Sequence, residues 1–254
     1  MFKVIIARLK QGHRTMKFPA GAPPEMPDRY KGRPEILKSA CPADCRACAE
    51  ACPTDAFDFS ERTRLDLGKC LFCADCIKAC PRGAIAFSRD YRMAVRQRED
   101  LIIEEGKTRM ELARALDKKI KRLLGRSLKL RQVSAGGCNA CEADVNVLDT
   151  VGWDLGRFGI QFVASPRHAD GILVTGPVTK NMELALKKTY AAMPEPKIVI
   201  AVGSCAIAGG PFRDHLETNN GVNSSLKVDL YVPGCPPNPL TILDGLLRLL
   251  GRIN

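Results

Sequence analysis

The chain has 254 residues, of which 45% are hydrophobic, and its formal net charge is +11. This composition predicts a soluble globular protein, and no apolar run approaches the ~18 residues that span a bilayer. The first residues lack the long apolar segment and cleavage site of a secretory signal, so we expect the protein to stay in the cytoplasm. With one Trp and no RNA-binding motif, the basic excess does not indicate a nucleic-acid-binding protein, and an anionic membrane surface or acidic partners explain it as well.

The N-terminal 35 residues predict a short amphipathic helix followed by an extended strap. Four apolar residues share one helical face, with basic side chains elsewhere: Phe2, Ile5, Ile6 and Leu9. Such a helix either lies on a membrane or on membrane subunits, or packs on its own domain, and the sequence leaves both alternatives open. Residues 17–36 are rich in proline and predict an extended segment that lies over a partner. We therefore expect residues 1–35 to precede the first domain.

Two cysteine-rich runs repeat one pattern. Residues 41–53 read "CPADCRACAEACP", and residues 70–81 read "CLFCADCIKACP". The second is the run of bacterial ferredoxins, in which the first three cysteines hold one 4Fe-4S cluster and the fourth crosses to the other cluster. The predicted ligands of cluster 1 are Cys41, Cys45, Cys48 and Cys80. Those of cluster 2 are Cys52, Cys70, Cys73 and Cys76.

The repeat predicts an α+β ferredoxin-like domain with two 4Fe-4S clusters over residues 36–93. Twelve cysteines in a reducing compartment favour metal ligation over disulfides. Zinc is the alternative, but zinc prefers two C-x2-C pairs separated by a longer loop. The first run departs from the ferredoxin pattern by one extra residue between Cys41 and Cys45. A short hairpin is expected between the runs, and so small a core predicts that the domain unfolds without its clusters.

Residues 94–127 are highly charged and predict a connecting helix between two domains. Gly125 is the expected end of this helix. Apolar residues recur before it at helical spacing: Met110, Leu112, Leu116, Ile120 and Leu123.

Residues 128–254 predict an α/β domain with a parallel sheet. Short apolar runs alternate there with helical stretches at residues 181–192 and 238–250. The expected strands are residues 128–133, 160–164, 171–175, 197–202 and 228–232.

The four remaining cysteines follow strands of this sheet: Cys138, Cys141, Cys205 and Cys235. Because the carboxyl ends of parallel strands meet at one edge, the four thiols predict a single site, cluster 3. A nucleotide site is disfavoured, because no G-x-G-x-x-G follows the first strand. Three clusters with roughly two negative charges each would lower the net charge to about +5. Glycine-rich loops let the backbone approach a cluster, so Gly137, Gly203 and Ser204 are candidate cluster-binding residues.

Other side chains are expected at the same edge. The segments "SPRHAD" (165–170) and "TGPVT" (175–179) are predicted there. Arg167 either stabilises the negative charge of a reduced cluster or forms an ordinary salt bridge with Asp170. Glu142 is a candidate proton relay, or it caps a helix, and His168 is equally consistent with a structural role.

Several of these motifs resemble known subunits. The stretches "GGCNACEADV" (136–145) and "VDLYVPGCPPNP" (228–239) resemble the small subunit of membrane-associated nickel-iron hydrogenases of group 4, including formate hydrogenlyase. They also resemble the complex I subunit that carries the terminal cluster before quinone. The stretches "PDRYKGRPE" (27–35) and "YRMAVRQREDLI" (91–102) resemble the two-cluster ferredoxin-like subunit of the same complexes. The chain thus resembles a fusion of two neighbouring subunits.

The resemblance implies an electron relay with a flavodoxin-like C-terminal domain. Three 4Fe-4S clusters would connect an upstream electron donor to the nickel-iron site of a partner large subunit, which reduces protons to H2 or runs in reverse. The chain itself has no candidate nickel ligands, so no catalytic residue is expected on it. Membrane-embedded complex-I-like subunits are further implied partners, at the cytoplasmic face of the cell membrane.

The spacing of Cys138 and Cys141 separates the two relatives. Complex I subunits of this family carry adjacent cysteines, whereas the hydrogenase branch carries C-x2-C, as this chain does. The hydrogenase is therefore favoured. The alternatives are the equivalent subunit of a complex-I-like ferredoxin or quinone oxidoreductase without nickel, and a free-standing electron carrier.

Overall fold

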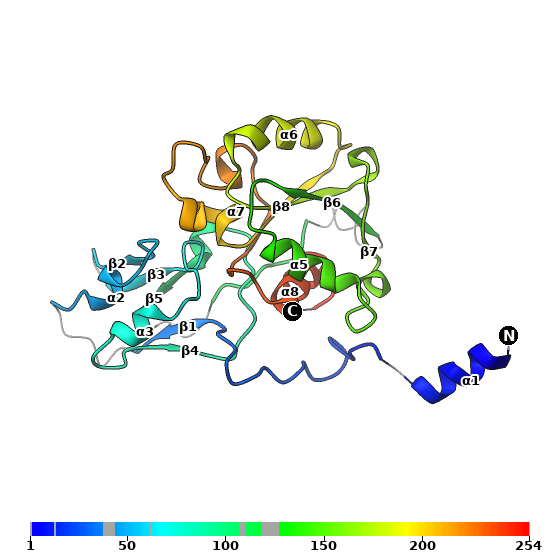
Figure 1. The fold of residues 1–254 in the computed structure, drawn as a ribbon, viewed down its shortest axis with the longest axis horizontal. Helices are drawn as coiled ribbons and strands as arrows, with labels where there is room; N and C mark the ends of the chain where they lie inside the picture. Colours follow the sequence, from blue (N-terminus) through cyan, green and yellow to red (C-terminus); the bar gives the residue numbers. More distant parts are fainter. Residues whose placement is uncertain are drawn as a thin grey trace.

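A computed structural model of the chain describes residues 2–12, 14–37, 44–60, 62–106, 110–117 and 127–253. Figure 1 shows a small lobe of short strands and helices beside a larger α/β lobe, with the N-terminal helix projecting away from both. We call these the dicluster lobe, which includes residues 34–104, and the α/β lobe, residues 128–249.

The α/β lobe is built on a five-stranded parallel sheet. Its strands are β6 (Leu128–Ser134), β7 (Ile160–Phe162), β8 (Gly171–Thr175), β9 (Ile198–Val202) and β10 (Leu230–Val232). They are ordered β10-β9-β8-β6-β7. Read from β7, with the strands of this lobe numbered along the chain, this order is 2-1-3-4-5. Every residue of β8, β9 and β10 is buried, as in a sheet covered on both faces. The predicted parallel sheet is confirmed.

Helices cover both faces of this sheet. The core on one face includes side chains of α5 (Ala140–Asn146) and α8 (Pro239–Leu249). The core on the other face includes side chains of α6 (Lys180–Ala191) and α7 (Ser204–Ala208). Single 3-10 turns complete the lobe: η2 (Val147–Asp149), η3 (Leu155–Phe158), η4 (Pro166–His168), η5 (Gly210–Phe212) and η6 (Val222–Ser224).

The dicluster lobe contains two small antiparallel sheets and two short helices. One sheet pairs β1 (Pro34–Ile36) with β4 (Ile85–Phe87). The other joins β2 (Phe57–Asp58), β3 (Arg64–Asp66) and β5 (Ile102–Glu104). The helices α2 (Ala47–Glu50) and α3 (Asp75–Ala79) carry the middle of the two cysteine runs. The β2–β3 pair is the hairpin predicted between the runs.

The helix predicted over residues 94–127 is wrong for the part of that segment that the structure describes. Val95 forms an antiparallel bridge with Tyr231 of β10, and η1 (Arg98–Leu101) is a single 3-10 turn. The strand β5 belongs to the sheet of the dicluster lobe. Residues 110–117 contain no helix, and the predicted Ile120, Leu123 and Gly125 lie outside the described residues.

Tertiary packing explains this error. Ala113 and Leu116 are buried in the core of the α/β lobe that also contains α8. Their backbone N–H groups donate to Ala94 O, at 2.8 Å, and to Leu249 O, at 2.9 Å. These long-range hydrogen bonds take the place of helical hydrogen bonds. The apolar residues at helical spacing are therefore buried although their segment is not a helix.

The N-terminal strap, predicted to lie over a partner, crosses both lobes of its own chain. Phe18 is buried in the α/β core, and its carbonyl accepts a hydrogen bond of 2.7 Å from Arg157 Nη2. Further along, Gly32 N donates to Ser88 O and Arg33 N donates to Asp90 O. The strap therefore connects the two lobes.

The helix α1 (Phe2–Gln11) does not pack on its own domain, which removes one of the two alternatives for it. None of its residues is buried, and Figure 1 shows it projecting from the body. Within the described residues, no helix has the length and hydropathy needed to cross a bilayer.

Candidate cluster-binding sites

The four cysteines of the α/β lobe converge at the carboxyl edge of its sheet, and we call them the sheet-edge thiols: Cys138, Cys141, Cys205 and Cys235. Burial raises the pKa of Cys141, and the neighbouring charges of the other three thiols raise it further. Burial likewise raises the pKa of Cys205 to about 12, with added contributions from Cys235 and Cys138. Cys138 and Cys235 are exposed, whereas Cys205 is buried. The site therefore opens to the surface on one side.

Glycines make room beside the sheet-edge thiols. A Cβ on Gly203 would lie 2.5 Å from Cys141 Sγ, and one on Gly210 would lie 2.6 Å from Cys205 Sγ. Gly203 has φ +90°, a left-handed conformation that glycine adopts without strain. Gly137 lies against Gly176, where a Cβ would be 3.2 Å from Gly176 Cα. A larger side chain at any of these positions would collide with a thiol or with the backbone around the site.

A second group of thiols lies in the dicluster lobe: Cys52, Cys70, Cys73 and Cys76. Burial, opposed by the hydrogen bond from Phe72 N and assisted by the charges of the other three thiols, raises the pKa of Cys70 to about 12. Burial and the charges of Cys73 and Cys52 raise the pKa of Cys76 to about 11. Two backbone N–H groups donate to sulfur, Phe72 N to Cys70 Sγ and Ala56 N to Cys52 Sγ, each at 3.3 Å.

The thiols predicted for cluster 1 are described in part. Cys41 lies outside the described residues. Cys48 is buried in a small core with Cys76 and Ile85. Partial burial of Cys80 opposes ionisation, but backbone N–H donors led by that of Ala84, at 3.2 Å from Sγ, outweigh it and lower the pKa of this thiol. Cys80 therefore lies in a backbone nest that favours the thiolate.

The donor set fits iron-sulfur clusters. The eleven described cysteines form no disulfide with one another. Backbone N–H groups directed at cysteine sulfur stabilise thiolates and are among the groups that tune clusters. Thiols with strongly raised pKa values need a bound cation to become thiolates, because a coordinated metal deprotonates them. Among the described residues, no group of three or more His, Cys, Asp or Glu side chains is arranged to hold a single metal ion.

The second group of thiols and the sheet-edge thiols lie next to each other where the two lobes meet. The charge of Cys73 contributes to raising the pKa of Cys235, after burial and Cys138. Ser204 Oγ donates a hydrogen bond of 2.6 Å to Cys70 O, and Lys31 Nζ donates one of 2.8 Å to Cys73 O. The loop of Cys70 and the loop of Cys205 are therefore in direct contact.

Further contacts hold this seam closed. Arg213 of the α/β lobe donates to Thr54 O at 2.8 Å and to Asp55 Oδ2 at 2.9 Å, both in the dicluster lobe. A Cβ on Gly68 would lie 2.7 Å from Ile207 Cγ2, so the two lobes touch closely there. Cys76 of the second thiol group also lies in one small core with Cys48, so the second group neighbours both the thiols predicted for cluster 1 and the sheet-edge thiols.

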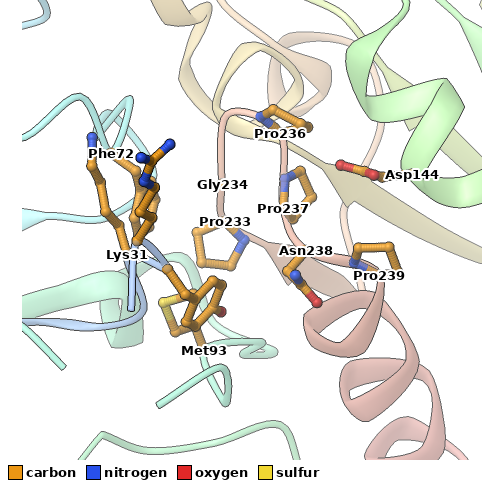
Figure 2. A pocket seen from close by; sticks show the side chains of 12 residues that line it. Lys31, Phe72, Met93, Asp144, Pro233, Gly234, Pro236, Pro237, Asn238 and Pro239 are labelled. Carbon is orange, nitrogen blue, oxygen red and sulfur yellow. The ribbon is translucent and has the colours of Figure 1, made fainter. Parts of the chain in front are cut away.

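A pocket of about 270 Å³ lies beside this seam. Figure 2 shows Lys31, Phe72 and Met93 on one side of it and Asp144 on the other, with the Pro233–Pro239 loop between them. Phe72 is in the loop of cluster 2, and the proline-rich loop contains Cys235. The loops of the two thiol groups thus both border the pocket.

The prediction that Arg167 lies beside cluster 3 is wrong. The segment 165–170 precedes β8, whereas the sheet-edge thiols follow their strands. Gly171 pairs with Leu130, and Thr175 pairs with Ser134, so the segment enters at the amino end of β8. The five-residue strand separates the segment from the thiols by about 16 Å. Arg167 and His168 are both exposed.

The alternative for Arg167, a salt bridge with Asp170, is also absent from the ion pairs of the described residues. Asp170 Oδ2 instead accepts a hydrogen bond of 2.7 Å from Lys129 N, at the start of the sheet. This backbone contact explains the carboxylate without the arginine.

Glu142 lies beside the sheet-edge thiols, as predicted, and its surroundings add a partner. Its side chain is buried, and Oε1 accepts a hydrogen bond of 2.6 Å from the hydroxyl of Thr175 at the end of β8. Glu142 also lines a cavity of about 490 Å³ with Asn139 and Arg131. A buried carboxyl group that borders an open cavity is suited to a proton path.

Three side chains of the site were missed from the sequence. Thr175, Lys31 and Arg213 each contact a loop or side chain of the site. "TGPVT" identified the segment of Thr175 but not the hydroxyl. Lys31 and Arg213 act across the seam between lobes, and no local pattern marks such contacts.

Comparisons with known proteins place both halves of the chain. Residues 138–249 match the model of the family "NADH ubiquinone oxidoreductase, 20 Kd subunit", and residues 40–84 match that of the "4Fe-4S dicluster domain". A probable membrane-bound hydrogenase subunit from Pyrococcus furiosus is 42% identical over 141 residues, which are 54% of this chain and 84% of that protein. An NADH-quinone oxidoreductase subunit from Citrifermentans bemidjiense is 46% identical over 117 residues, 46% of this chain and 68% of that protein.

A solved structure also matches. A chain of the membrane-bound sulfane sulfur reductase, an archaeal respiratory membrane complex, is 33% identical, with a TM-score of 0.46. The match covers 53% of this chain and 75% of that one.

Proposed function

Because the chain belongs to the family of the NADH ubiquinone oxidoreductase 20 Kd subunit, joined here to a 4Fe-4S dicluster domain, we propose that it is the electron-relay subunit of a membrane-associated nickel-iron hydrogenase complex. Its relatives are subunits of oxidoreductase complexes, either NADH-quinone oxidoreductase or membrane-bound hydrogenase. An electron-transfer role within such a complex is common to both.

The proposed cofactors are three 4Fe-4S clusters. Cluster 1 takes Cys41, Cys45, Cys48 and Cys80, and cluster 2 takes Cys52, Cys70, Cys73 and Cys76. The sheet-edge thiols hold cluster 3. Each cluster, when bound, supplies a site that accepts and releases one electron at a potential set by its surroundings. Gly137, Gly203 and Ser204 shape the backbone around cluster 3.

The adjacency of the second thiol group and the sheet-edge thiols is the observation that carries this proposal. The hydrogen bond from Ser204 to Cys70 O and the proximity of Cys73 to Cys235 support one continuous path through the two groups. The exposed Cys138 leaves the sheet-edge thiols open to the surface. A relay must expose its terminal site to a partner, and the proposed partner is a large subunit with a nickel-iron centre.

The C-x2-C spacing supports the hydrogenase assignment. Asn139, between the two cysteines, has φ +72° and immediately precedes α5, so Cys141 starts inside the helix while Cys138 stays outside it. Adjacent cysteines, as in complex I relatives, could not occupy these two places. The second candidate is a complex-I-like ferredoxin or quinone oxidoreductase subunit without nickel, which the 46% identity to an NADH-quinone oxidoreductase subunit favours.

The N-terminal helix supports a place on the membrane surface. Its exposed apolar side chains include Phe2, at 82% exposure, and Leu9, at 77%. Its last turn carries Arg8 and Lys10. An amphipathic helix with basic flanks suits an anionic surface or membrane-embedded subunits, and we place the chain at the cytoplasmic face.

Two finer assignments complete the proposal. The strand order 2-1-3-4-5 is that of flavodoxin-like sheets, and it supports that description of the α/β lobe. Glu142 is the proposed proton relay, because its buried carboxyl group is held by Thr175 at the edge of an open cavity.

Metal analysis of the intact complex tests the function. The account predicts about twelve iron atoms per chain, together with nickel in the partner subunit and hydrogen evolution from a low-potential donor. A value near eight iron atoms per chain would refute the third cluster. Three clusters with no nickel in the complex would replace the hydrogenase by the second candidate.

A further inference from the structure

Ser204 lies where the loops of clusters 2 and 3 meet. Its side chain is 1% exposed. The hydroxyl lies within hydrogen-bond distance of two carbonyl oxygens, Cys70 O at 2.6 Å and Gly234 O at 3.1 Å, and its one proton points to one of them at a time. Cys70 belongs to the second thiol group, and Gly234 precedes Cys235 of the sheet-edge thiols. The serine itself precedes Cys205, so one residue touches the backbone of both groups.

Local structure does not account for the bond to Cys70. The backbone N–H of Ser204 already donates to Gly234 O at 2.8 Å, which holds α7 against the proline-rich loop. Gly203, not a side chain, caps α7. A serine hydroxyl has one proton, and the shorter of its two contacts is the one that crosses between lobes. The hydroxyl therefore contributes more to the contact between the two lobes than to the stability of α7.

The bond completes a compact path between the two groups of thiols. From Cys70 Sγ the covalent chain runs to the Cys70 carbonyl oxygen, crosses one hydrogen bond to Ser204 Oγ, and continues through the backbone to Cys205 Sγ. Both cysteines at the ends of this path are buried. A short hydrogen bond inside protein is stronger than one in water and holds its partners in one geometry.

We propose that Ser204 is a positioning residue for electron transfer between clusters 2 and 3, acting through the hydrogen bond from its hydroxyl to Cys70 O. This inference rests on the proposed function. In each transfer one electron leaves one cluster and arrives at the other, so that the first is oxidised and the second reduced by one electron. The Ser204 proton stays on Oγ.

The test uses the full chain in its complex, loaded with all three clusters. A light-triggered one-electron reductant starts the transfer, and paramagnetic resonance of rapidly frozen samples follows the electron from cluster 2 to cluster 3. S204A should slow this step several-fold, while the potentials of both clusters and the dipolar interaction between them stay as in the wild type. An unchanged rate in S204A would overturn the proposal.

Two controls separate positioning from structure. Arg213→Met removes hydrogen bonds across the same seam without touching Cys70, so it should lower the unfolding midpoint but slow the transfer less than S204A does. An equal slowing in R213M would assign the effect to general docking of the lobes and overturn the inference. The pair S204T and S204V has matched volume and differs in the hydroxyl, so S204T should transfer faster than S204V.

Failures of the two proposals are distinguishable. Absence of a cluster 3 signal in the wild type would refute the proposed function, whatever Ser204 does. If the wild type loads all three clusters but S204A and S204V both fail to load cluster 3, the hydroxyl is needed for assembly and the positioning role is overturned.

Discussion

The two lobes stabilise themselves differently. The α/β lobe has a sheet whose central strands are wholly buried, with a large apolar core on each face. In the dicluster lobe, Leu67, Leu101 and Ile103 join a core of the α/β lobe. The lobe's own two cores are small, one formed by Ile36, Ala56 and Leu65 and the other by Cys48, Cys76 and Ile85. Two of these six core residues are predicted cluster ligands. We therefore expect the α/β lobe to fold around its hydrocarbon cores, and the part of the dicluster lobe around the cysteines to depend on the proposed clusters.

Iron removal should have the largest effect, and the effect should differ between the two lobes. Chelation under reducing conditions leaves the dicluster lobe without the groups that fill its centre, so we expect its amides to lose protection in hydrogen exchange almost completely. The amides of β8 and β9 should keep theirs. Equal loss in both lobes would show that the lobes are one cooperative unit.

Loss of one sheet-edge thiol should have the next largest effect, confined to the other end of the relay. Cys235→Ser is expected to remove the cluster 3 signal and to abolish electron transfer to the partner, because one of its four thiolates is gone. The signals of clusters 1 and 2 should persist in paramagnetic resonance. Disappearance of all three signals together would contradict two separately built lobes.

A cavity in the α/β core should destabilise that lobe alone. Leu173→Ala, at a fully buried position of β8, should lower the free energy of unfolding by about 2–5 kcal/mol. The control Leu184→Ala, at 61% exposure on α6, should change it by less than about 0.5 kcal/mol. Denaturant unfolding followed by circular dichroism measures both changes in free energy. If the dicluster lobe stays folded after the α/β lobe has unfolded, iron should be released at a higher denaturant concentration than the one at which the circular dichroism signal is lost.

The smallest expected effect concerns Asp144 and pH. Burial raises the pKa of this carboxyl group, so its ionised form destabilises the folded state above that pKa. Asp144→Asn should therefore raise the free energy of unfolding at pH 7 by less than about 1 kcal/mol, because solvent screens the group. The gain should fade as the pH falls toward the ordinary carboxyl pKa of about 4. A gain that grows on acidification would contradict the assignment.

The pKa of Asp214 is shifted in the opposite direction from that of Asp144. Its hydrogen bond with Asn220 and its contact with Arg213 lower the pKa of the carboxyl group. Asp214→Asn should therefore lower the unfolding midpoint at pH 7, and the loss should shrink as the pH falls through the lowered pKa.

Local patterns predicted what depends on local physics. The apolar runs of the sheet, the hairpin between the cysteine runs and the meeting of Cys138, Cys141, Cys205 and Cys235 follow from strand periodicity and from the geometry of parallel sheets. These features need no knowledge of how the two lobes dock.

Features set by tertiary contacts could not be predicted in this way. Ala113 and Leu116 have helical spacing, but backbone bonds to Ala94 and Leu249 hold their segment out of a helix. The pattern around Arg167 predicts the wrong end of the sheet, because its segment leads into a strand instead of following one. The hydrogen bond from Ser204 to Cys70 joins residues far apart in sequence, and no motif around either residue predicts it.

The most direct test of the account is the pattern of magnetic coupling among the clusters in the fully reduced, intact chain. Because the second thiol group lies between the other two, paramagnetic resonance should show cluster 2 coupled to both neighbours, with weak coupling between clusters 1 and 3. Cys235→Ser should leave the coupling of clusters 1 and 2 intact. A cluster 3 signal that is uncoupled, or that couples more strongly to cluster 1 than to cluster 2, would contradict the relay.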